Sequence, residues 1–158
     1  GATAIALRKE EAHLQVTASD ISEQAVAVAR KNAADNAADV TFLTGDMLEP
    51  FIEAGIRCDI LVSNPPYIPV HEQMEHSVVD FEPHVALFGG EDGLKFYREI
   101  FANAHRVIKE KAILAFEMGY DQGERLRALA KEHFPDARVE IIKDLSGKNR
   151  MLFVYHNL

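Results

Sequence analysis

The stretch "DILVSNPPYI", Asp59–Ile68, decides the fold. A strand is expected over Cys58–Ser63, and the uninterrupted apolar run Ile60–Val62 predicts burial on both faces, as in a parallel sheet. The following Asn64 and its two prolines can continue neither a strand nor a helix. A strand that leaves the core onto a rigid, polar, aromatic corner holds carbonyl groups and an amide in place. This arrangement indicates a binding or catalytic site.

The composition indicates one globular α/β domain. The chain has 158 residues, 47% of them hydrophobic, which suits a single core. A formal net charge of -8 and the lack of a Lys/Arg run argue against non-specific binding to nucleic acid as the main activity. Only Cys58 is present, so an internal disulfide is impossible and a reducing compartment fits. No apolar run reaches the length of a membrane span and no secretion signal opens the chain, so we expect a cytoplasmic protein without a membrane partner.

Apolar periodicity and turn residues predict alternating helices and strands. Helices are expected over 2–9, 22–34, 92–108 and 120–134, and strands over 14–18, 40–43, 58–63, 112–116, 138–142 and 151–155. The last two strands are joined by "KDLSGKNR", which is typical of a hairpin. This order predicts one domain over 1–158 with a doubly wound, Rossmann-like, mostly parallel sheet that ends in an antiparallel hairpin strand.

Polar residues follow three of the predicted strands. Asp20, Asp46 and Asn64 each stand at a strand's carboxyl end, where doubly wound sheets bind ligands, so we expect them to converge on one crevice. A helix cap is the alternative for Asp20, but Ser22 is better placed to cap, which leaves the carboxylate for the hydroxyls of a ribose. A turn aspartate is the alternative for Asp46, which could instead accept from an adenine amine, with Met47 packed on the ring.

The Asn64–Tyr67 corner is the sharpest signal. The side-chain carbonyl of Asn64 and the backbone carbonyl of Pro65 can both accept hydrogen bonds, which suits a planar –NH2 group, and Tyr67 can stack on a flat amide or base. Such a nitrogen is a poor nucleophile and needs a strong electrophile, for example a sulfonium methyl donor. Alignment and carbonyl dipoles would be the enzyme's contribution. His71, His76 and His84 show no metal-ligand spacing, so no metal is expected.

With "NPPYI", the chain resembles the HemK-type protein-(glutamine-N5) methyltransferases, which use S-adenosylmethionine and act on peptide chain release factors. The matching stretches are 64–68, "SDISEQAVAVARKNA" at 19–33, "FEPHVALFGGEDGLKFYREI" at 81–100, "FEMGYDQG" at 116–123 and "KDLSGKNR" at 143–150. The resemblance implies a seven-stranded sheet whose last strand is antiparallel. It also implies the glutamine of a Gly-Gly-Gln loop as acceptor and S-adenosylhomocysteine as product, without a metal and without a direct need for nucleic acid.

The resemblance further implies which residues contact each ligand. The donor site comprises Gly1, Asp20, Ile21, Asp46, Met47 and Asn64, and the glutamine site comprises Asn64, Pro65, Pro66 and Tyr67, of which Asn64, Pro65 and Tyr67 are catalytic.

The chain departs from that family at its start. Gly1 resembles the last glycine of the family's donor-binding loop, and the first strand, the rest of that loop and the N-terminal helical domain are lacking, so we expect the 158-residue chain alone to be inactive. Three other functions stay open: methylation of a ribosomal-protein glutamine, N6-adenine methylation of nucleic acid, and nucleotide binding without catalysis.

Overall fold

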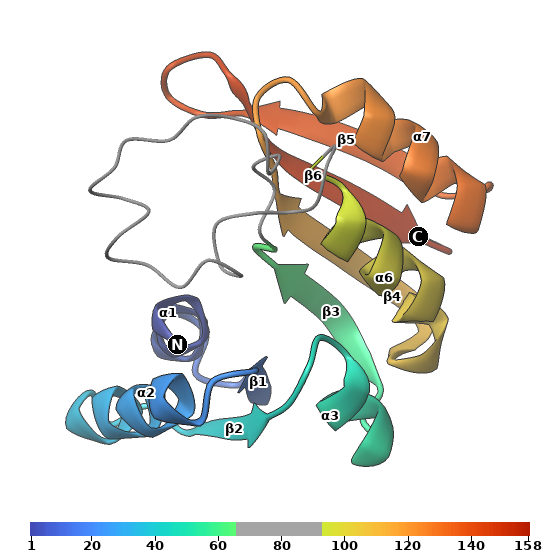
Figure 1. Cartoon of the computed structure of the whole chain (residues 1–158). Helices are drawn as coiled ribbons and strands as arrows, with labels where there is room; N and C mark the ends of the chain where they lie inside the picture. The colour runs from blue at the N-terminus through green and yellow to red at the C-terminus, as the bar shows by residue number, and fades with distance from the viewer. Residues whose placement is uncertain (66–92) are drawn as a thin grey trace. The chain divides into compact units, whose positions relative to one another are not determined.

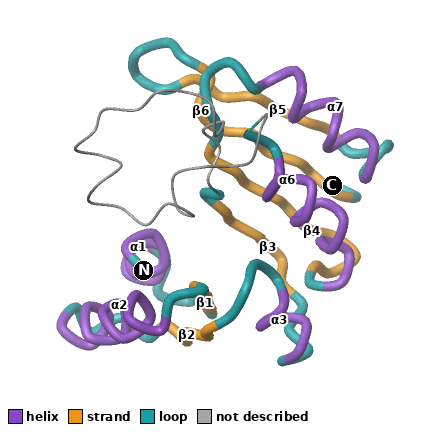
Figure 2. The backbone as a smooth tube through the Cα atoms, viewed as in Figure 1, coloured by secondary structure: helices purple, strands orange, loops and turns teal. Residues whose placement is uncertain are grey.

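The computed structural model describes residues 1–65 and 93–158 (Figure 1). These residues form two compact units, Gly1–Ile56 and Arg57–Leu158, each of which is described by itself. The expectations for Pro66, Tyr67 and the three loop histidines lie outside the described residues, as does Asp92, the first residue of the helix predicted over 92–108. Along the tube of Figure 2, helices and strands alternate in both units, as expected of an α/β protein.

The first unit contains a parallel pair of strands with helices. Its elements are α1 (Ala2–Glu10), β1 (Val16–Asp20), α2 (Glu23–Asp35), β2 (Val40–Thr44) and α3 (Glu49–Glu53). Strand β1 pairs with β2 in parallel, and α2 is the connection between them. A small cluster of buried apolar side chains joins the two longer helices to the strands: Ile5, Val26, Ala29, Ala33 and Phe42.

Helix α2 begins where its sequence predicts. The Ser22 side chain accepts a hydrogen bond from the backbone N–H of Ala25 at 3.2 Å, which satisfies one of the donors that a helix start leaves unpaired. Five alanines keep the helix regular, and those on one side let it lie close to the strands. The predicted N-cap is therefore confirmed.

Gly1, directly before α1, lies close against Ala29 of α2. A Cβ atom on Gly1 would stand 2.7 Å from the Cβ of Ala29, closer than two carbon atoms can lie without a shift. The carbonyl of Gly1 also accepts the first helical hydrogen bond, from Ile5 N at 3.0 Å. Close packing of the two helices therefore depends on a glycine at this position.

The second unit contains a mixed four-stranded sheet. Its elements are β3 (Cys58–Ser63), α6 (Lys95–Asn103), the short 3-10 helix η1 (Ala104–Arg106), β4 (Ile108–Glu117), α7 (Gly123–His133), β5 (Arg138–Lys143) and β6 (Asn149–His156). The strand order is β3-β4-β6-β5, in which β3 and β4 are parallel and β6 is antiparallel to both of its neighbours. The predicted C-terminal hairpin is confirmed.

Helices α6 and α7 lie on one face of that sheet (Figure 1). Leu114, Phe116, Leu152 and Val154 on β4 and β6 are 0% exposed and form the centre of the core. From α6, the Phe101 ring meets the Phe116 ring at 5.1 Å between centroids, and Tyr97 meets it edge-on at 6.0 Å. In the described part of the chain, no helix is both long and apolar enough to cross a membrane.

The prediction that β3 is buried on both faces is wrong. Leu61 is buried on the face that it shares with its partner Leu114, whereas Ile60 and Val62 are 49% and 43% exposed. An apolar run is compatible with one covered face or two, because side chains alternate along a strand whatever covers them. Within residues 1–65 and 93–158, only the Leu61 face of β3 is well covered.

Other boundaries differ from the predicted ones for identifiable reasons. The helix predicted over 92–108 ends at Asn103, and Ile108 already starts β4; both Val107 and Ile108 are buried, so apolar spacing could not show the change. Strand β4 is longer than expected, and α7 begins at Gly123 instead of Tyr120. The five-residue helix α3 was not predicted, because a single turn is too short to show a period.

Candidate active site

Strands β1 and β2 bring two predicted donor-site segments to one edge. Asp20 pairs with Thr44 in the parallel register, and the backbone N–H of Gly45 donates to the Asp20 carbonyl at 3.0 Å. Asp46 and Met47 follow directly. The parallel pair thus places Asp20 beside the 45–47 turn, at the carboxyl ends where ligands bind in this fold class.

The Asp20 side chain has one oxygen engaged in a local turn. Its Oδ1 accepts from the backbone N–H of Ser22 at 2.9 Å, while Ser22 itself caps α2. We expected a carboxylate without local partners; one of its two oxygens, Oδ1, is instead engaged by Ser22 N–H. Within the described residues Oδ2 has no hydrogen-bond partner, and the neighbouring Ile21 is exposed, so both can contact a ligand.

The 45–47 turn is tightly built. A Cβ on Gly45 would lie 2.5 Å from Cγ of Pro50, so only glycine fits without a shift. Met47 has φ of 46°, a left-handed conformation that costs a non-glycine residue of the order of 1 kcal/mol. Its carbonyl accepts from Ser19 Oγ at 3.4 Å, which helps to hold it. Non-glycine residues kept in such conformations are concentrated at functional sites.

In the second unit, the Asn64–Pro65 corner begins at the carboxyl end of β3. Ser63 pairs with Phe116 of β4, so Asn64 follows at the level of Glu117. Asn64 is exposed and Pro65 is buried. The buried proline anchors the corner, and the exposed Asn64 carries a side-chain carbonyl that can accept from a ligand.

The neighbouring end of β4 is anchored by side chains that sequence reasoning missed. The Tyr97 hydroxyl donates to the carbonyl of Glu117, and Arg150 Nη1 donates to the carbonyl of Met118 at 3.4 Å. The N–H of Gly119 donates to Gln122 Oε1 at 2.8 Å. Partners from α6, β6 and the start of α7 therefore hold three consecutive residues beside Asn64.

Gln122 also links this strand end to the start of α6. Its Nε2 donates to the carbonyl of Gly93 at 3.4 Å, and the side chain is only 2% exposed. Among the described residues it is the one buried polar side chain. A glutamine directly before an apolar-periodic helix was a usable sequence signal, since buried amides are retained for their hydrogen bonds.

Asp20 and Asp46 belong to the first unit and Asn64 to the second, so their convergence on one crevice stays a prediction. The roles predicted for Gly1, Ile21, Met47 and the Asn64–Tyr67 corner likewise stay predictions. Gly1 lies in close contact with Ala29 of α2, where a larger residue would not fit without a shift.

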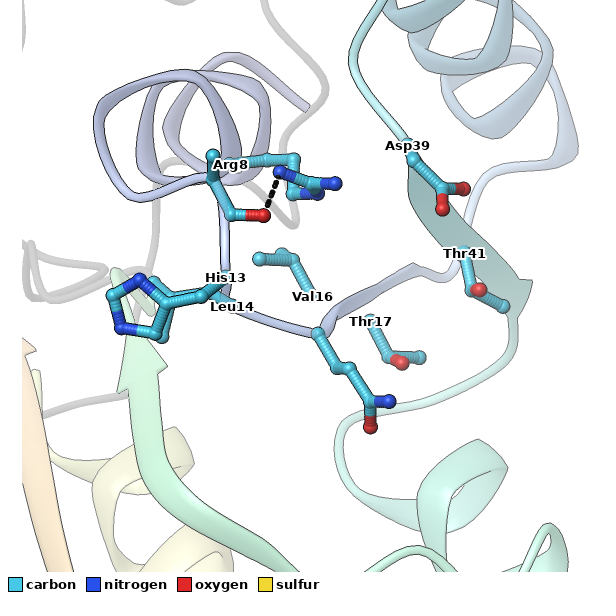
Figure 3. A pocket seen from close by; sticks show the side chains of 9 residues that line it. Arg8, His13, Leu14, Val16, Thr17, Asp39 and Thr41 are labelled. Carbon is cyan, nitrogen blue, oxygen red and sulfur yellow. Dashed lines mark hydrogen bonds between the residues drawn. The ribbon is translucent and has the colours of Figure 1, made fainter.

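A cavity of about 380 Å³ lies at the amino ends of β1 and β2 (Figure 3). Its lining includes His13, Val16, Thr17, Asp39 and Thr41, which precede or begin the two strands, and Arg8, whose guanidinium donates to the Ala12 carbonyl. These residues are at the amino ends of the strands, opposite Asp20. This cavity is therefore distinct from the predicted donor site.

Neither a metal nor a cysteine nucleophile is indicated by the described residues. Within 1–65 and 93–158, no three His, Cys, Asp or Glu side chains are grouped so that they could hold an ion. Burial, and after it the charge of Asp59, raises the pKa of the Cys58 thiol, which keeps it protonated and unreactive.

Comparison with known proteins identifies the family and supports the fold. Residues 1–81 match the methyltransferase small domain family. Release factor glutamine methyltransferases of Bacillus anthracis and Staphylococcus aureus are 46% and 41% identical over 155 and 154 residues. These alignments cover 97% and 96% of this chain and 55% of each relative, so the chain spans about half the length of the curated relatives it matches.

Solved structures show the fold. A methyltransferase from Pyrococcus furiosus superposes with a TM-score of 0.69 at 20% identity, over 99% of this chain and 70% of that one. A release factor-specific protein-(glutamine-N5) methyltransferase from Alicyclobacillus acidocaldarius superposes with a TM-score of 0.54 at 21% identity, over 99% and 92%. The predicted Rossmann-like methyltransferase fold is thus confirmed, and the chain belongs to the methyltransferase small domain family.

Proposed function

We propose that this chain is the catalytic part of an enzyme that transfers a methyl group from S-adenosylmethionine to the side-chain amide nitrogen of glutamine in the Gly-Gly-Gln loop of peptide chain release factors. The observation that carries the proposal is the Asn64–Pro65 corner at the carboxyl end of β3, with an exposed amide on a buried proline. The relatives named release factor glutamine methyltransferase support the choice of substrate. With such a substrate, we propose that the enzyme acts in the cytoplasm.

The corner suits an amide nitrogen as acceptor. Asn64 Oδ1 and the Pro65 carbonyl can accept the two N–H groups of a glutamine –NH2 group, which orients the nitrogen and favours the positive charge that develops on it. An amide nitrogen is weakly nucleophilic because its lone pair is delocalised, so alignment is the main contribution that the protein can make. The nitrogen becomes acidic as the new C–N bond forms, and water can remove its proton.

The donor would be held by the first unit. When bound, it supplies an electrophilic methyl group on a sulfonium sulfur. Asp20 Oδ2 can accept from a ribose hydroxyl, and the exposed Ile21 can contact the adenosine. Asp46 can accept from the adenine amine, with Met47 against the ring. The free Oδ2 and the exposed Ile21 are the features that fit this role.

An assay of methyl transfer by the Asn64→Ala variant tests the acceptor site. In the natural protein that contains this chain, we expect loss of roughly 2–4 kcal/mol of transition-state stabilisation, or about 30- to 1000-fold in single-turnover rate, because an aligned acceptor for the reacting group is gone. Affinity for S-adenosylhomocysteine should stay within about twofold, since Asn64 is proposed to act mainly on the acceptor. An unchanged transfer rate would remove Asn64 from the mechanism.

The Asp20→Ala variant tests the donor site. Loss of a charge-assisted hydrogen bond should weaken S-adenosylhomocysteine binding by roughly 1.5–3 kcal/mol in calorimetry. Ser22→Ala is the matched control, because it removes the α2 cap next to Asp20 without removing the carboxylate. Equal affinity in Asp20→Ala and the unaltered protein would mean that Asp20 is only a turn residue.

The choice of acceptor is tested with a panel of substrates. Release factor, glutamine-containing ribosomal protein and adenine-containing DNA or RNA are offered to the same enzyme with labelled donor. We expect label on the release factor only. Label on nucleic acid, or donor binding without transfer to any member of the panel, would favour an adenine methyltransferase or a non-catalytic nucleotide-binding protein respectively.

A further inference from the structure

The turn between β5 and β6 lies on the same edge of the sheet as Asn64. Met151 of β6 pairs with Glu117 at the carboxyl end of β4, and the turn 144–148 comes just before β6 begins at Asn149. Asn64 follows Ser63, which pairs with Phe116 on the other side of β4. The hairpin turn and the candidate acceptor site thus share one edge of one sheet, within the second unit.

That turn is rigidly built around Asp144. Its Oδ1 accepts from the backbone N–H groups of Ser146 and Lys148 at 2.9 and 3.1 Å, and its Oδ2 accepts from Arg150 Nε at 3.3 Å. The hydrogen bond from Lys148 N–H, and after it Arg150, holds the pKa of the Asp144 carboxyl below its ordinary value. Gly147 has φ of 79°, which the tight turn requires. Arg150 in addition reaches the Met118 carbonyl, so the turn is tied to the end of β4.

This rigid turn presents apolar and basic groups to solvent. Leu145 at its tip is fully exposed. The Lys148 ammonium lies 5.1 Å from the ring centroid of Tyr120, which is itself exposed and follows the end of β4. A single exposed leucine is common on protein surfaces. Here the exposed leucine stands on a fixed backbone, beside an aromatic–cation pair, and on the same edge of the sheet as the candidate acceptor site. Such a combination is typical of a surface that contacts a partner.

The spacing along the edge fits an extended polypeptide as the partner. Neighbouring strands lie about 4.8 Å apart, so β6 and β5 are roughly 10 and 15 Å from β3 in the order β3-β4-β6-β5. An extended polypeptide advances about 3.3 Å per residue, so this distance corresponds to about three to five residues. A polypeptide with its modified residue at Asn64 therefore reaches the hairpin tip with residues a few positions away.

We propose that Leu145 and the Tyr120–Lys148 pair form a docking surface for the polypeptide substrate, about three to five residues from the side chain that is modified. The occupant is an extended segment that places an apolar side chain on Leu145 and a carbonyl or carboxylate oxygen near Lys148. This inference rests on the proposed function, and it adds a determinant of protein-substrate recognition separate from the Asn64–Pro65 corner.

Leu145→Ser tests the docking surface in the natural protein. Two substrates are compared: a peptide with about six residues on each side of the acceptor glutamine, and one truncated about two residues from it. KM for the long peptide should rise about tenfold with kcat unchanged, because the contact assists binding and takes no part in the chemistry. The short peptide cannot reach Leu145, so its KM should be the same for the variant and the unaltered enzyme. Tyr120→Ala should show the same dependence on peptide length.

Leu158→Ser is the matched control. Leu158 is also exposed, but it lies beyond the far end of β6, which ends at His156. KM should be unaffected by this control for both peptides. An unchanged KM of Leu145→Ser for the long peptide would overturn the docking surface alone, with the transfer reaction intact.

Two further outcomes are informative. A lower melting temperature of Leu145→Ser than of Leu158→Ser would mean that another part of the protein covers Leu145, which also overturns the docking surface. Absence of transfer to the release factor and to both peptides by the unaltered enzyme would contradict the proposed function itself, and the docking surface with it.

Discussion

The two candidate strand ends are held in different ways. At the end of β1, Asp20 is bonded to Ser22, two residues away, and the turn at Asp46 is closed by a backbone bond from Glu49. At the end of β4, the backbone of Glu117–Gly119 is held by Tyr97 and Arg150, 20 and 32 residues distant from their partners. The proposed donor side thus combines local turns with two bonds between β1 and the 45–47 turn, from Gly45 N–H to the Asp20 carbonyl and from Ser19 Oγ to the Met47 carbonyl. The acceptor side depends more on side chains from other elements, Tyr97 of α6 and Arg150 of β6.

The apolar cores next to the two strand ends also differ, in the burial and packing of their central phenylalanines. Phe42 of β2 packs in a small cluster with Ile5 of α1 and three buried residues of α2, and is 6% exposed. Phe116 in the second unit is 0% exposed and packs against Tyr97 and Phe101. Substitutions on the acceptor side should therefore cost more stability and affect more distant residues.

The largest effect is expected for Phe116→Ala. Removing the ring leaves a cavity between α6 and the sheet, and we expect a loss of about 3–5 kcal/mol in the free energy of unfolding by urea. The same substitution at Phe42 should cost less, since that cluster is smaller and closer to solvent. An equal or larger loss at Phe42 would break the contrast between the two units.

Gln122→Ala should have an intermediate effect. It leaves the buried N–H of Gly119 without its acceptor and the carbonyl of Gly93 without its donor, at a cost of about 1–3 kcal/mol in unfolding free energy. Protection of the Gly119 amide against hydrogen exchange should fall as well. Gln24→Ala on the exposed side of α2 is the control, for which the change should stay within about 0.5 kcal/mol. Similar losses of unfolding free energy in the two variants would show that Gln122 does not anchor the end of β4.

The smallest effect is expected for Ser22→Ala. Loss of the N-cap bond to Ala25 should cost about 1 kcal/mol of stability, with the change in hydrogen exchange confined to the first turn of α2. Ser22→Asp restores a capping side chain and should recover most of the loss. Lost protection at Gly119 in the Ser22→Ala variant would contradict the view that the first strand end is locally organised.

Several elements could be predicted because their signals are local. The limits of β3 are those that the sequence predicts, and Ser22 caps α2 as expected. The Asn64–Pro65 corner could also be recognised, because an asparagine before two prolines at a strand end has few purely structural explanations. The C-terminal hairpin was predicted from its turn residues, and β5 and β6 pair as expected.

Other features depended on partners that are distant in sequence. The exposure of Ile60 and Val62 follows from which face of β3 the helices cover, and a run of apolar letters does not contain that information. The change from helix to strand between Asn103 and Ile108 was hidden because both elements bury the same residue types there.

By itself, the sequence determined the alternation of helices and strands, the family resemblance and the residues at the carboxyl ends of β1, β2 and β3, because capping, turn chemistry and apolar periodicity act over a few neighbouring residues. Only the tertiary structure decided the strand order β3-β4-β6-β5, the anchoring of Glu117–Gly119 by Tyr97, Gln122 and Arg150, and the placement of the Leu145 turn on the edge that carries Asn64. The physical reason is that pairing register and buried hydrogen bonds join residues far apart in the chain, and they form only when the sheet brings those residues together.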